Sequence, residues 1–104
     1  MNVTTYTGWR LSDGRALVEV ERHDGTITFR SSLNEEFPVF NWGYDGGGPW
    51  YLAQFLLQDA TQTSPIGKAC INAYVRDFVA NWNDGWSTTS QEIMQWYASH
   101  SPIR

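Results

Sequence analysis

The amino-acid sequence predicts an α+β domain, in which an antiparallel N-terminal β-meander is followed by three α-helices packed on one face of the sheet. Three observations support this class. Apolar and polar side chains alternate over residues 16–22, as in a strand with one solvated face. Asp24-Gly25 is a dipeptide typical of tight β-hairpin turns. In the second half of the chain, apolar residues recur instead at helical spacing, at Ile66, Cys70, Ala73, Tyr74 and Phe78.

Three or four strands are expected at the start of the chain. The first three are predicted at residues 3–10, 16–22 and 26–30, with turn signals at Ser12-Asp13-Gly14 and His23-Asp24-Gly25. In the second strand Val18 and Val20 alternate with two glutamates, and in the third Ile27 and Phe29 share one face. Residues 39–42 are predicted either as a short fourth strand or as an extended lead into a glycine-rich segment.

Three helices are expected to follow, at residues 50–60, 66–82 and 92–100. The first is apolar on most sides, which is typical of a helix buried at the centre of a fold. Ser64-Pro65 resembles an N-cap and a first-turn proline for the second helix. Thr89 and Glu92 have the spacing of a capping box for the third. We therefore interpret residues 1–104 as a single domain, with a β-meander at 1–42, a glycine-rich loop at 43–49 and three helices at 50–100.

Composition excludes several classes of partner. The 104 residues carry 7 basic and 11 acidic side chains, a net charge of −4, whereas binding to duplex DNA requires a basic face. The single cysteine, Cys70, cannot form an intramolecular disulfide, which fits a reducing compartment. No apolar run approaches the roughly 20 residues that cross a bilayer, so we expect no membrane partner. A cytoplasmic location is the resulting prediction.

The segment over residues 40–50 is the most unusual part of the sequence, and it reads Phe-Asn-Trp-Gly-Tyr-Asp-Gly-Gly-Gly-Pro-Trp. Glycines followed by Pro49 predict a loop of exposed amides that enters a helix N-terminus, where amides and the helix dipole favour an anion. Trp42, Tyr44 and Trp50 flank this loop and can stack on a flat ligand. The alternative is a tight strand-to-helix turn, in which the glycines let Trp42 and Trp50 reach the core.

The predicted ligand-binding residues offer a free amide, an aromatic ring or a charge: Trp42, Tyr44, Asp45, Gly46, Gly47, Gly48, Trp50, Arg22 and Arg30. Asp45 opposes a polyanionic ligand, because its carboxylate repels phosphate, although it can accept hydrogen bonds from a base or a ribose. Arg22 and Arg30 would supply positive charge. The alternative for the two arginines is a solvated position on the face of a strand.

The sequence shows no catalytic constellation. Glu19 and Glu21 share one strand face, whereas hydrolases that use two carboxylates hold them on opposite sides of a cleft. The histidines and the cysteine do not have the spacing of metal ligands, and no Gly-x-Ser-x-Gly elbow is present. We therefore expect a protein that is not an enzyme and has no cofactor and no metal.

Several of these motifs together resemble a family of small proteins known as DUF6166, a domain of unknown function. The resemblance rests on Phe40-Asn41-Trp42-Gly43-Tyr44, on Gly48-Pro49, and on the pattern Trp86-x-x-Thr89-x-x-Glu92-Ile93-x-x-Trp96. It covers roughly the last two-thirds of the chain well and the meander loosely. It implies a phage, plasmid or other mobile-element context, in which small acidic proteins often counter host defence by binding. Asp45 and Trp50-Tyr51 depart from the family pattern, so the ligand of this member can differ.

Two hypotheses of function follow, with a third that is weaker. The first is a non-enzymatic protein of a mobile element that sequesters a small anionic ligand, a nucleotide-type signal, and so counters host defence. The alternative is a protein-interaction module that inhibits a host defence enzyme or complex directly, because aromatic residues are enriched at binding hot spots. Its candidate residues are Trp82, Trp86, Trp96 and Tyr97. A homo-oligomer is a further expectation, and a small nucleotide hydrolase is the weaker alternative.

Overall fold

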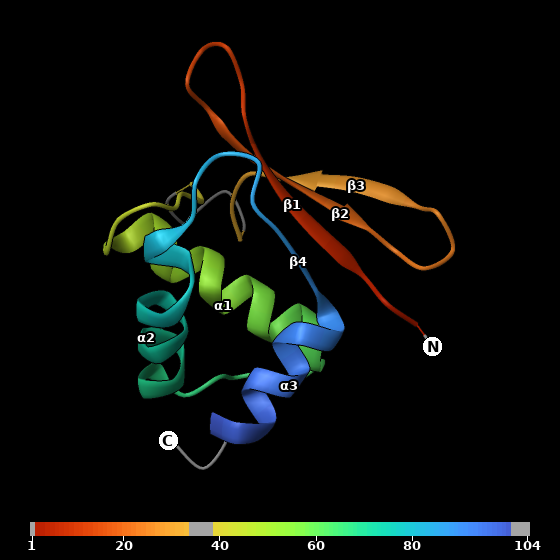
Figure 1. The fold of residues 1–104 in the computed structure, drawn as a ribbon, viewed down its shortest axis with the longest axis vertical. Helices are drawn as coiled ribbons and strands as arrows, with labels where there is room; N and C mark the ends of the chain where they lie inside the picture. Colours follow the sequence, from red (N-terminus) through yellow and green to blue (C-terminus); the bar gives the residue numbers. More distant parts are fainter. Residues whose placement is uncertain (1, 34–38, 101–104) are drawn as a thin grey trace.

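The described residues fold into a four-stranded antiparallel sheet with three α-helices on one of its faces (Figure 1), and this confirms the predicted α+β class. The computed structural model describes residues 2–33 and 39–100. The strands lie in the order β3-β2-β1-β4. The first three are consecutive in sequence, whereas β4 comes from a segment between the second and third helices.

The predicted meander is present as β1 (Thr5–Arg10), β2 (Ala16–Glu21) and β3 (Ile27–Arg30). Its two turns use the same chemistry. Gly14 and Gly25 both have a φ of +89°, a left-handed conformation that glycine adopts without strain. Asp13 and Asp24 each accept a hydrogen bond from the backbone N–H two residues later, at 3.0 and 2.9 Å. Local turn signals therefore account for this part of the sheet.

Of the two alternatives for residues 39–42, a short fourth strand and an extended lead, the structure has the second. Residues 39–42 form only one isolated bridge, between Ser32 and Val39, and serve as the extended lead into the glycine segment. The fourth strand is β4 (Ser87–Thr89), which pairs with β1 so that Tyr6 lies opposite Thr88. Three residues are too few to show the alternation that identifies a strand, and partners distant in sequence decide the pairing.

The two faces of the sheet differ in what they bury. Tyr6, Val18 and Val20 point toward the helices and are fully buried. Ile27 and Phe29 share a face, as predicted, but the register places them opposite Glu21 and Glu19 on the solvent side. They are 49% and 56% exposed. The helices therefore cover one face only.

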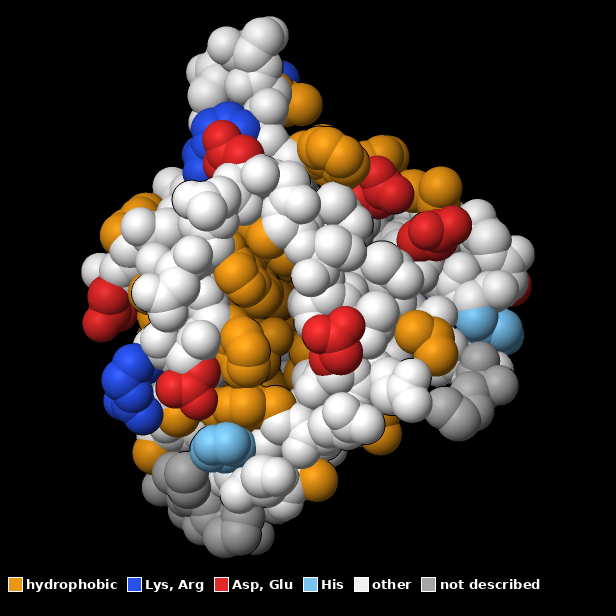
Figure 2. Space-filling model, viewed as in Figure 1, with side chains coloured by type: hydrophobic (Ala, Val, Ile, Leu, Met, Phe, Trp, Pro, Cys, Tyr) orange, Lys and Arg blue, Asp and Glu red, His pale blue; other side chains and the backbone are white. Residues whose placement is uncertain are grey.

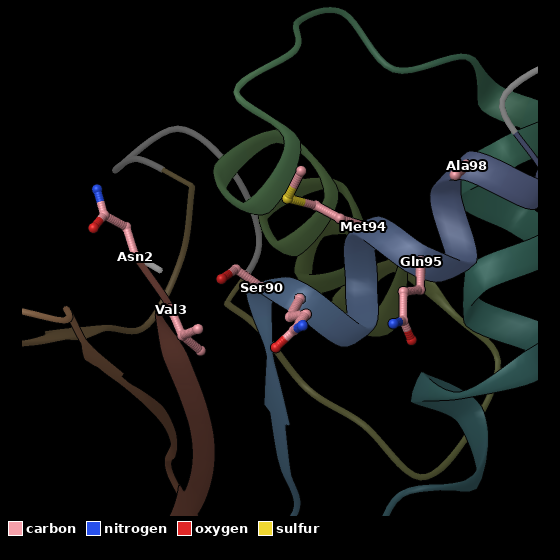
Figure 3. Close-up of a pocket in the computed structure, with 7 residues that line it drawn as sticks. Asn2, Val3, Ser90, Met94, Gln95 and Ala98 are labelled. Atoms are coloured by element: carbon pink, nitrogen blue, oxygen red, sulfur yellow. The ribbon is translucent and has the colours of Figure 1, made fainter.

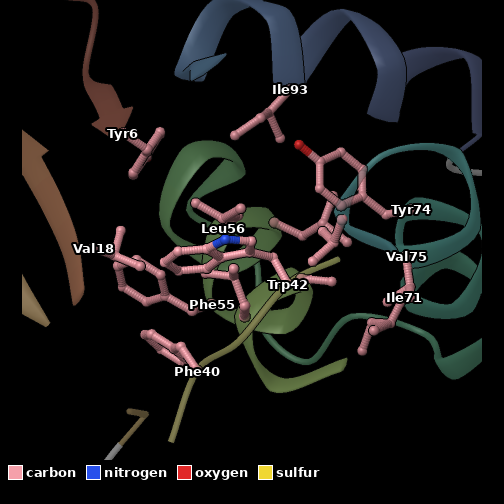
Figure 4. Close-up of a cluster of buried hydrophobic side chains, with 14 of the residues drawn as sticks. Tyr6, Val18, Phe40, Trp42, Phe55, Leu56, Ile71, Tyr74, Val75 and Ile93 are labelled. Carbon is pink, nitrogen blue, oxygen red and sulfur yellow. The ribbon is translucent and has the colours of Figure 1, made fainter. Parts of the chain in front are cut away.

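The first helix, α1 (Gly47–Thr61), begins three residues earlier than predicted, so the glycine-rich segment 43–49 is a loop only in its first half. Leu52, Leu56 and Leu57 are fully buried, which confirms the prediction of a central helix. In Figure 4, Leu56 and Phe55 lie beside Trp42 within the cluster of buried side chains.

The second helix is shorter than predicted. It spans α2 (Lys68–Asp77), and a short 3₁₀ helix, η1 (Val79–Asn81), follows Phe78. Ser64-Pro65 does not cap it, since the N-cap residue is Gly67. A Ser-Pro pair is typical of a turn as well as of a helix start, and here it lies in the loop before the helix.

The third helix, α3 (Ser90–His100), begins directly after β4. Thr89 Oγ1 accepts a hydrogen bond from the Glu92 N–H at 3.2 Å, which is the capping contact that the spacing predicted. In residues 2–33 and 39–100, no helix has both the length and the apolar character needed to cross a membrane.

Candidate binding surface

The glycine segment supplies the predicted helix N-terminus. Gly46 is the N-cap residue of α1 and offers no side-chain cap, and the first turn contains no acidic residue. The amides of Gly47 and Gly48 therefore lack an intrahelical acceptor. Gly47 is exposed and has open space around it. Gly48 also has a packing role, because a Cβ atom there would lie 2.8 Å from the Asn41 Cβ.

The three aromatic residues of this segment differ in how deeply they are buried and in whether they form hydrogen bonds. Trp42 is only 3% exposed, and its Nε1–H donates to Asp84 Oδ1 at 2.9 Å, so it is a core residue. Trp50 is half-buried and donates to Asn72 Oδ1 at 2.9 Å. Tyr44 is 48% exposed and its ring covers Gly46. Tyr44 thus has the most accessible ring of the three predicted stacking residues.

The predicted charged residues do not gather at the loop. Arg30 stacks over the Phe55 ring at 4.8 Å and donates to the Leu33 carbonyl at 2.6 Å. Arg22 pairs with Asp59. Phe55 and Asp59 lie about 12 and 18 Å from the start of α1, at about 1.5 Å of rise per residue. Asp45 is exposed beside Tyr44. The predicted set therefore does not form one site.

Arg22 belongs to a clamp that holds α1 against the sheet. Its guanidinium donates two hydrogen bonds to Asp59, at 2.7 and 3.0 Å, and the Tyr6 hydroxyl donates to the same carboxylate. Burial raises the pKa of Asp59, but the hydrogen bonds from Arg22 and Tyr6 outweigh it and leave that pKa below its usual range. Burial, together with the Asp59 carboxylate, raises the pKa of Tyr6.

A hollow of about 440 Å³ lies between the N-terminal segment and α3 (Figure 3). Its volume falls within the range of small-molecule pockets. The residues that line it are Asn2, Val3, Ser90, Gln91, Met94, Gln95 and Ala98. None of them carries a charge, so the hollow offers neither the cations that an anionic ligand requires nor a titratable group for catalysis.

A second depression lies between α2 with η1 on one side and β4 with α3 on the other. Figure 2 shows hydrophobic side chains exposed there in a band between two polar walls. The cavity in it measures about 100 Å³ and is lined by Tyr74, Phe78, Trp82, Ser87, Thr88, Glu92 and Ile93. We call these seven residues the aromatic groove.

The rings of the aromatic groove support one another. The Tyr74 ring is 5.0 Å from Phe78, 6.3 Å from Trp82 and 5.0 Å from Trp96, which flanks the groove. Trp82 in turn stacks on Trp86 at 4.1 Å. Tyr74 is 2% exposed and forms the floor, whereas Phe78 is 37% exposed. The rings are therefore held in place before any partner binds.

The aromatic groove is negatively charged. Glu92 is the one charged residue among those that line it. At the flank, Asp77 Oδ2 accepts a hydrogen bond from Trp96 Nε1 at 3.0 Å. Burial and the Glu92 carboxylate both raise the pKa of Tyr74, so its phenol is neutral near pH 7. Over the part of the chain that the structure describes, no three histidine, cysteine or acidic side chains gather to hold a metal ion.

The sequence identified this surface only in part. Of the four aromatic residues considered for an interface, Trp86 is in the core, whereas Trp82 and Trp96 line or flank the aromatic groove. Tyr97 is partly buried against the core. The sequence predicts Tyr74 and Phe78 as part of the apolar face of the second helix, and Glu92 as part of the N-terminal capping box of the third helix. The spacing of four between Tyr74 and Phe78 was a signal of neighbouring rings, but it does not reveal that the helix ends there.

A sequence profile of a family described as "Family of unknown function (DUF6166)" matches residues 6–99. No curated protein matches the chain significantly, and no solved structure does.

Proposed function

The chain belongs to the DUF6166 family, whose function is unknown, and we propose from its geometry that it is a non-enzymatic protein-interaction module. One observation carries this proposal: α2, η1, β4 and α3 form a preformed aromatic groove, in which Phe78 is exposed and Trp82 partly exposed beside a buried Tyr74. The groove adjoins the first residue of the glycine segment, because the Gly43 N–H donates to the Val79 carbonyl at 3.0 Å. Aromatic side chains in well-packed pockets are typical of binding hot spots. The aromatic groove favours an interaction module over a nucleotide-binding protein, because its lining residues belong to residues 74–93 rather than to the glycine segment.

The size of the cavity supports a macromolecular partner. The cavity has a volume of about 100 Å³. Pockets for drug-sized ligands start at about 300 Å³. One side chain of a partner fits this cavity, whereas a nucleotide does not.

A small anionic ligand at the start of α1 is the second candidate. The observation that favours it is the uncapped first turn of α1 beside the exposed Tyr44 ring. Three observations oppose this candidate. Trp42 is in the core, Arg22 binds Asp59, and Arg30 lies over the Phe55 ring, so both arginines contact later turns of α1 and not its start. Three finer predictions from the sequence are not tested by the structure: that the ligand is a nucleotide-type signal, that the protein forms a homo-oligomer, and that it hydrolyses nucleotides.

The biological context that we propose is interference with a host defence enzyme or complex by a mobile-element protein in the cytoplasm. This context rests on the family resemblance, because the family match carries neither a source nor a partner. The acidic net charge of −4 is compatible with a partner that presents a basic segment.

Affinity capture from host lysate with mass spectrometry tests the proposal, if wild type is compared with three variants. Phe78→Ala should abolish capture of the partner, because it removes a wall of the aromatic groove. Phe29→Ala is the matched control, since Phe29 is 56% exposed on the solvent face of the sheet. Capture should also survive Tyr44→Ala. Loss of capture in Tyr44→Ala together with retention in Phe78→Ala would instead place binding at the glycine segment.

A further inference from the structure

We propose that the cavity of the aromatic groove is a recognition site for an ammonium group, and that its occupant is a lysine side chain of the partner. This inference rests on the proposed function, because it names the chemistry of the partner at the same surface. It is carried by the lining of the cavity, which combines three aromatic rings with a single carboxylate.

The rings are placed to surround a cation. Tyr74, Phe78 and Trp82 all line the cavity, and the Tyr74 centroid is 5.0 Å from Phe78 and 6.3 Å from Trp82. A cation is attracted to an aromatic face when it lies within about 6 Å of the ring centroid. The interplanar angles from Tyr74 are 42° to Phe78 and 84° to Trp82, so these three rings do not form one parallel stack. Trp86 covers one face of Trp82, which leaves its other face for an occupant.

Charge selects a cation over other occupants. Among the described residues that line the cavity, Glu92 carries a negative charge and none is a lysine, an arginine or a histidine. The Glu92 carboxylate would repel an anion. A neutral apolar side chain would fill the space but would leave the exposed Glu92 carboxylate without an opposite charge to pair with. A lysine side chain satisfies both parts of the lining, because its stem is apolar and its head is positive.

Glu92 forms no ion pair within the described residues, so its carboxylate can bind a cation. Its side-chain contact within the described residues is a weak one, with the Thr89 hydroxyl at 3.4 Å, and the residue is exposed. Thr88, which also lines the cavity and hydrogen-bonds with Tyr74, adds a hydroxyl oxygen that can accept a hydrogen bond from an ammonium group. The cavity of about 100 Å³ limits the occupant to one head group and its nearest methylenes.

A titration of the whole chain with N-acetyl-lysine-methylamide tests the inference, with its Nε-acetylated form as the neutral control. The indole N–H signals of the six tryptophans report binding by NMR. We expect saturable shifts at Trp82 and Trp96 with the lysine derivative and none with the neutral form. Trp42, whose indole is 3% exposed and donates to Asp84 in the core, is the internal control and should not shift.

Two variants separate charge from packing. Glu92→Gln removes the charge but keeps the shape and the backbone N–H that Thr89 caps, so the fold should persist. We expect it to weaken binding of the lysine derivative at least tenfold, about 1.4 kcal/mol. Phe78→Ala should weaken it as well, and the dispersion of the remaining indole signals verifies that this variant folds.

The outcomes distinguish this inference from the proposed function. Equal binding of the neutral derivative, or unchanged binding in Glu92→Gln, would overturn the ammonium site even if a partner is captured through Phe78. Binding of the lysine derivative that depends on Glu92, without any partner that depends on Phe78, would support the ammonium site and contradict the interaction module. A flat titration with the wild type would overturn the ammonium site directly.

Discussion

The glycine segment and the aromatic groove differ in how well the sequence predicts an accessible binding surface. The glycine segment is conspicuous in the sequence, yet Trp42 is in the core and Trp50 is tied to Asn72. The aromatic groove has no motif, yet it brings Tyr74, Phe78 and Glu92 together from two helices. The unusual composition of the glycine segment thus reflects a positive φ at Gly43 and close backbone packing at Gly48. A binding surface, in contrast, can arise from ordinary residues that the fold brings together.

The largest expected effect concerns the core role of Trp42. Trp42→Ala removes a 3% exposed indole and should lower the free energy of unfolding by about 3–5 kcal/mol. Urea unfolding followed by circular dichroism measures this loss. A Trp42→Ala protein as stable as wild type would show that the indole is not part of the core, and would restore it as a stacking residue for a ligand.

The next effect concerns the clamp between α1 and the sheet. Asp59→Ala removes the acceptor of Arg22 and of the Tyr6 hydroxyl and should cost about 1–3 kcal/mol. Because Arg22 is partly exposed, solvent screening keeps the loss below that of a fully buried ion pair. The same urea experiment measures it. No loss of stability would free Arg22 for a role in ligand binding.

The pH dependence of stability follows from the same clamp. The pKa of Asp59 is lower in the folded state, so its contribution is present above about pH 4 and is lost as the pH falls further. The pKa of Tyr6 is higher in the folded state, so its contribution is present below about pH 10 and is lost as the pH rises above that value.

Unfolding free energies measured across pH test both limbs. Asp59→Asn should reduce the slope of the acid limb without removing it, because the pKa values of Asp13, Asp24 and Asp84 are lowered as well. Tyr6→Phe should likewise reduce the slope of the alkaline limb. The alkaline slope should not vanish in Tyr6→Phe, because the pKa of Tyr74 is raised as well. A Tyr6→Phe protein with the full alkaline slope would contradict the role of Tyr6.

The smallest effect on stability is expected at Tyr44. Tyr44→Ala removes a 48% exposed ring and should change the free energy of unfolding by less than about 0.5 kcal/mol. It is therefore a clean probe of the anion hypothesis in a thermal-shift screen with cyclic and linear nucleotides. A wild-type response that Tyr44→Ala abolishes would support a ligand at the start of α1.

The sequence predicted the parts of the fold that depend on local chemistry. Asp24-Gly25 made a hairpin, and Thr89 with Glu92 made a helix start, because turns and caps involve residues near one another. It did not predict β4, whose three residues pair with β1 across most of the chain. It also did not show that Ile27 and Phe29 face solvent, because the register of pairing decides which face they occupy.

The sequence predicted which type of residue forms the candidate site, but not where the site lies in the fold. Aromatic residues of the second half of the chain were identified as an alternative interface, and Trp82 lines the aromatic groove. The cavity itself depends on where α2 ends, at Asp77, and on how β4 and α3 lie opposite Phe78 and Trp82. Neither property follows from periodicity, since tertiary contacts fix both.

The central claim is that the partner binds at the aromatic groove, and calorimetry on the captured partner tests it most directly. The dissociation constant should be compared among wild type, Phe78→Ala and Phe29→Ala, with each variant verified as folded. We predict that Phe78→Ala weakens binding at least tenfold, about 1.4 kcal/mol, and that Phe29→Ala leaves it unchanged. Equal affinity of wild type and Phe78→Ala would contradict the claim.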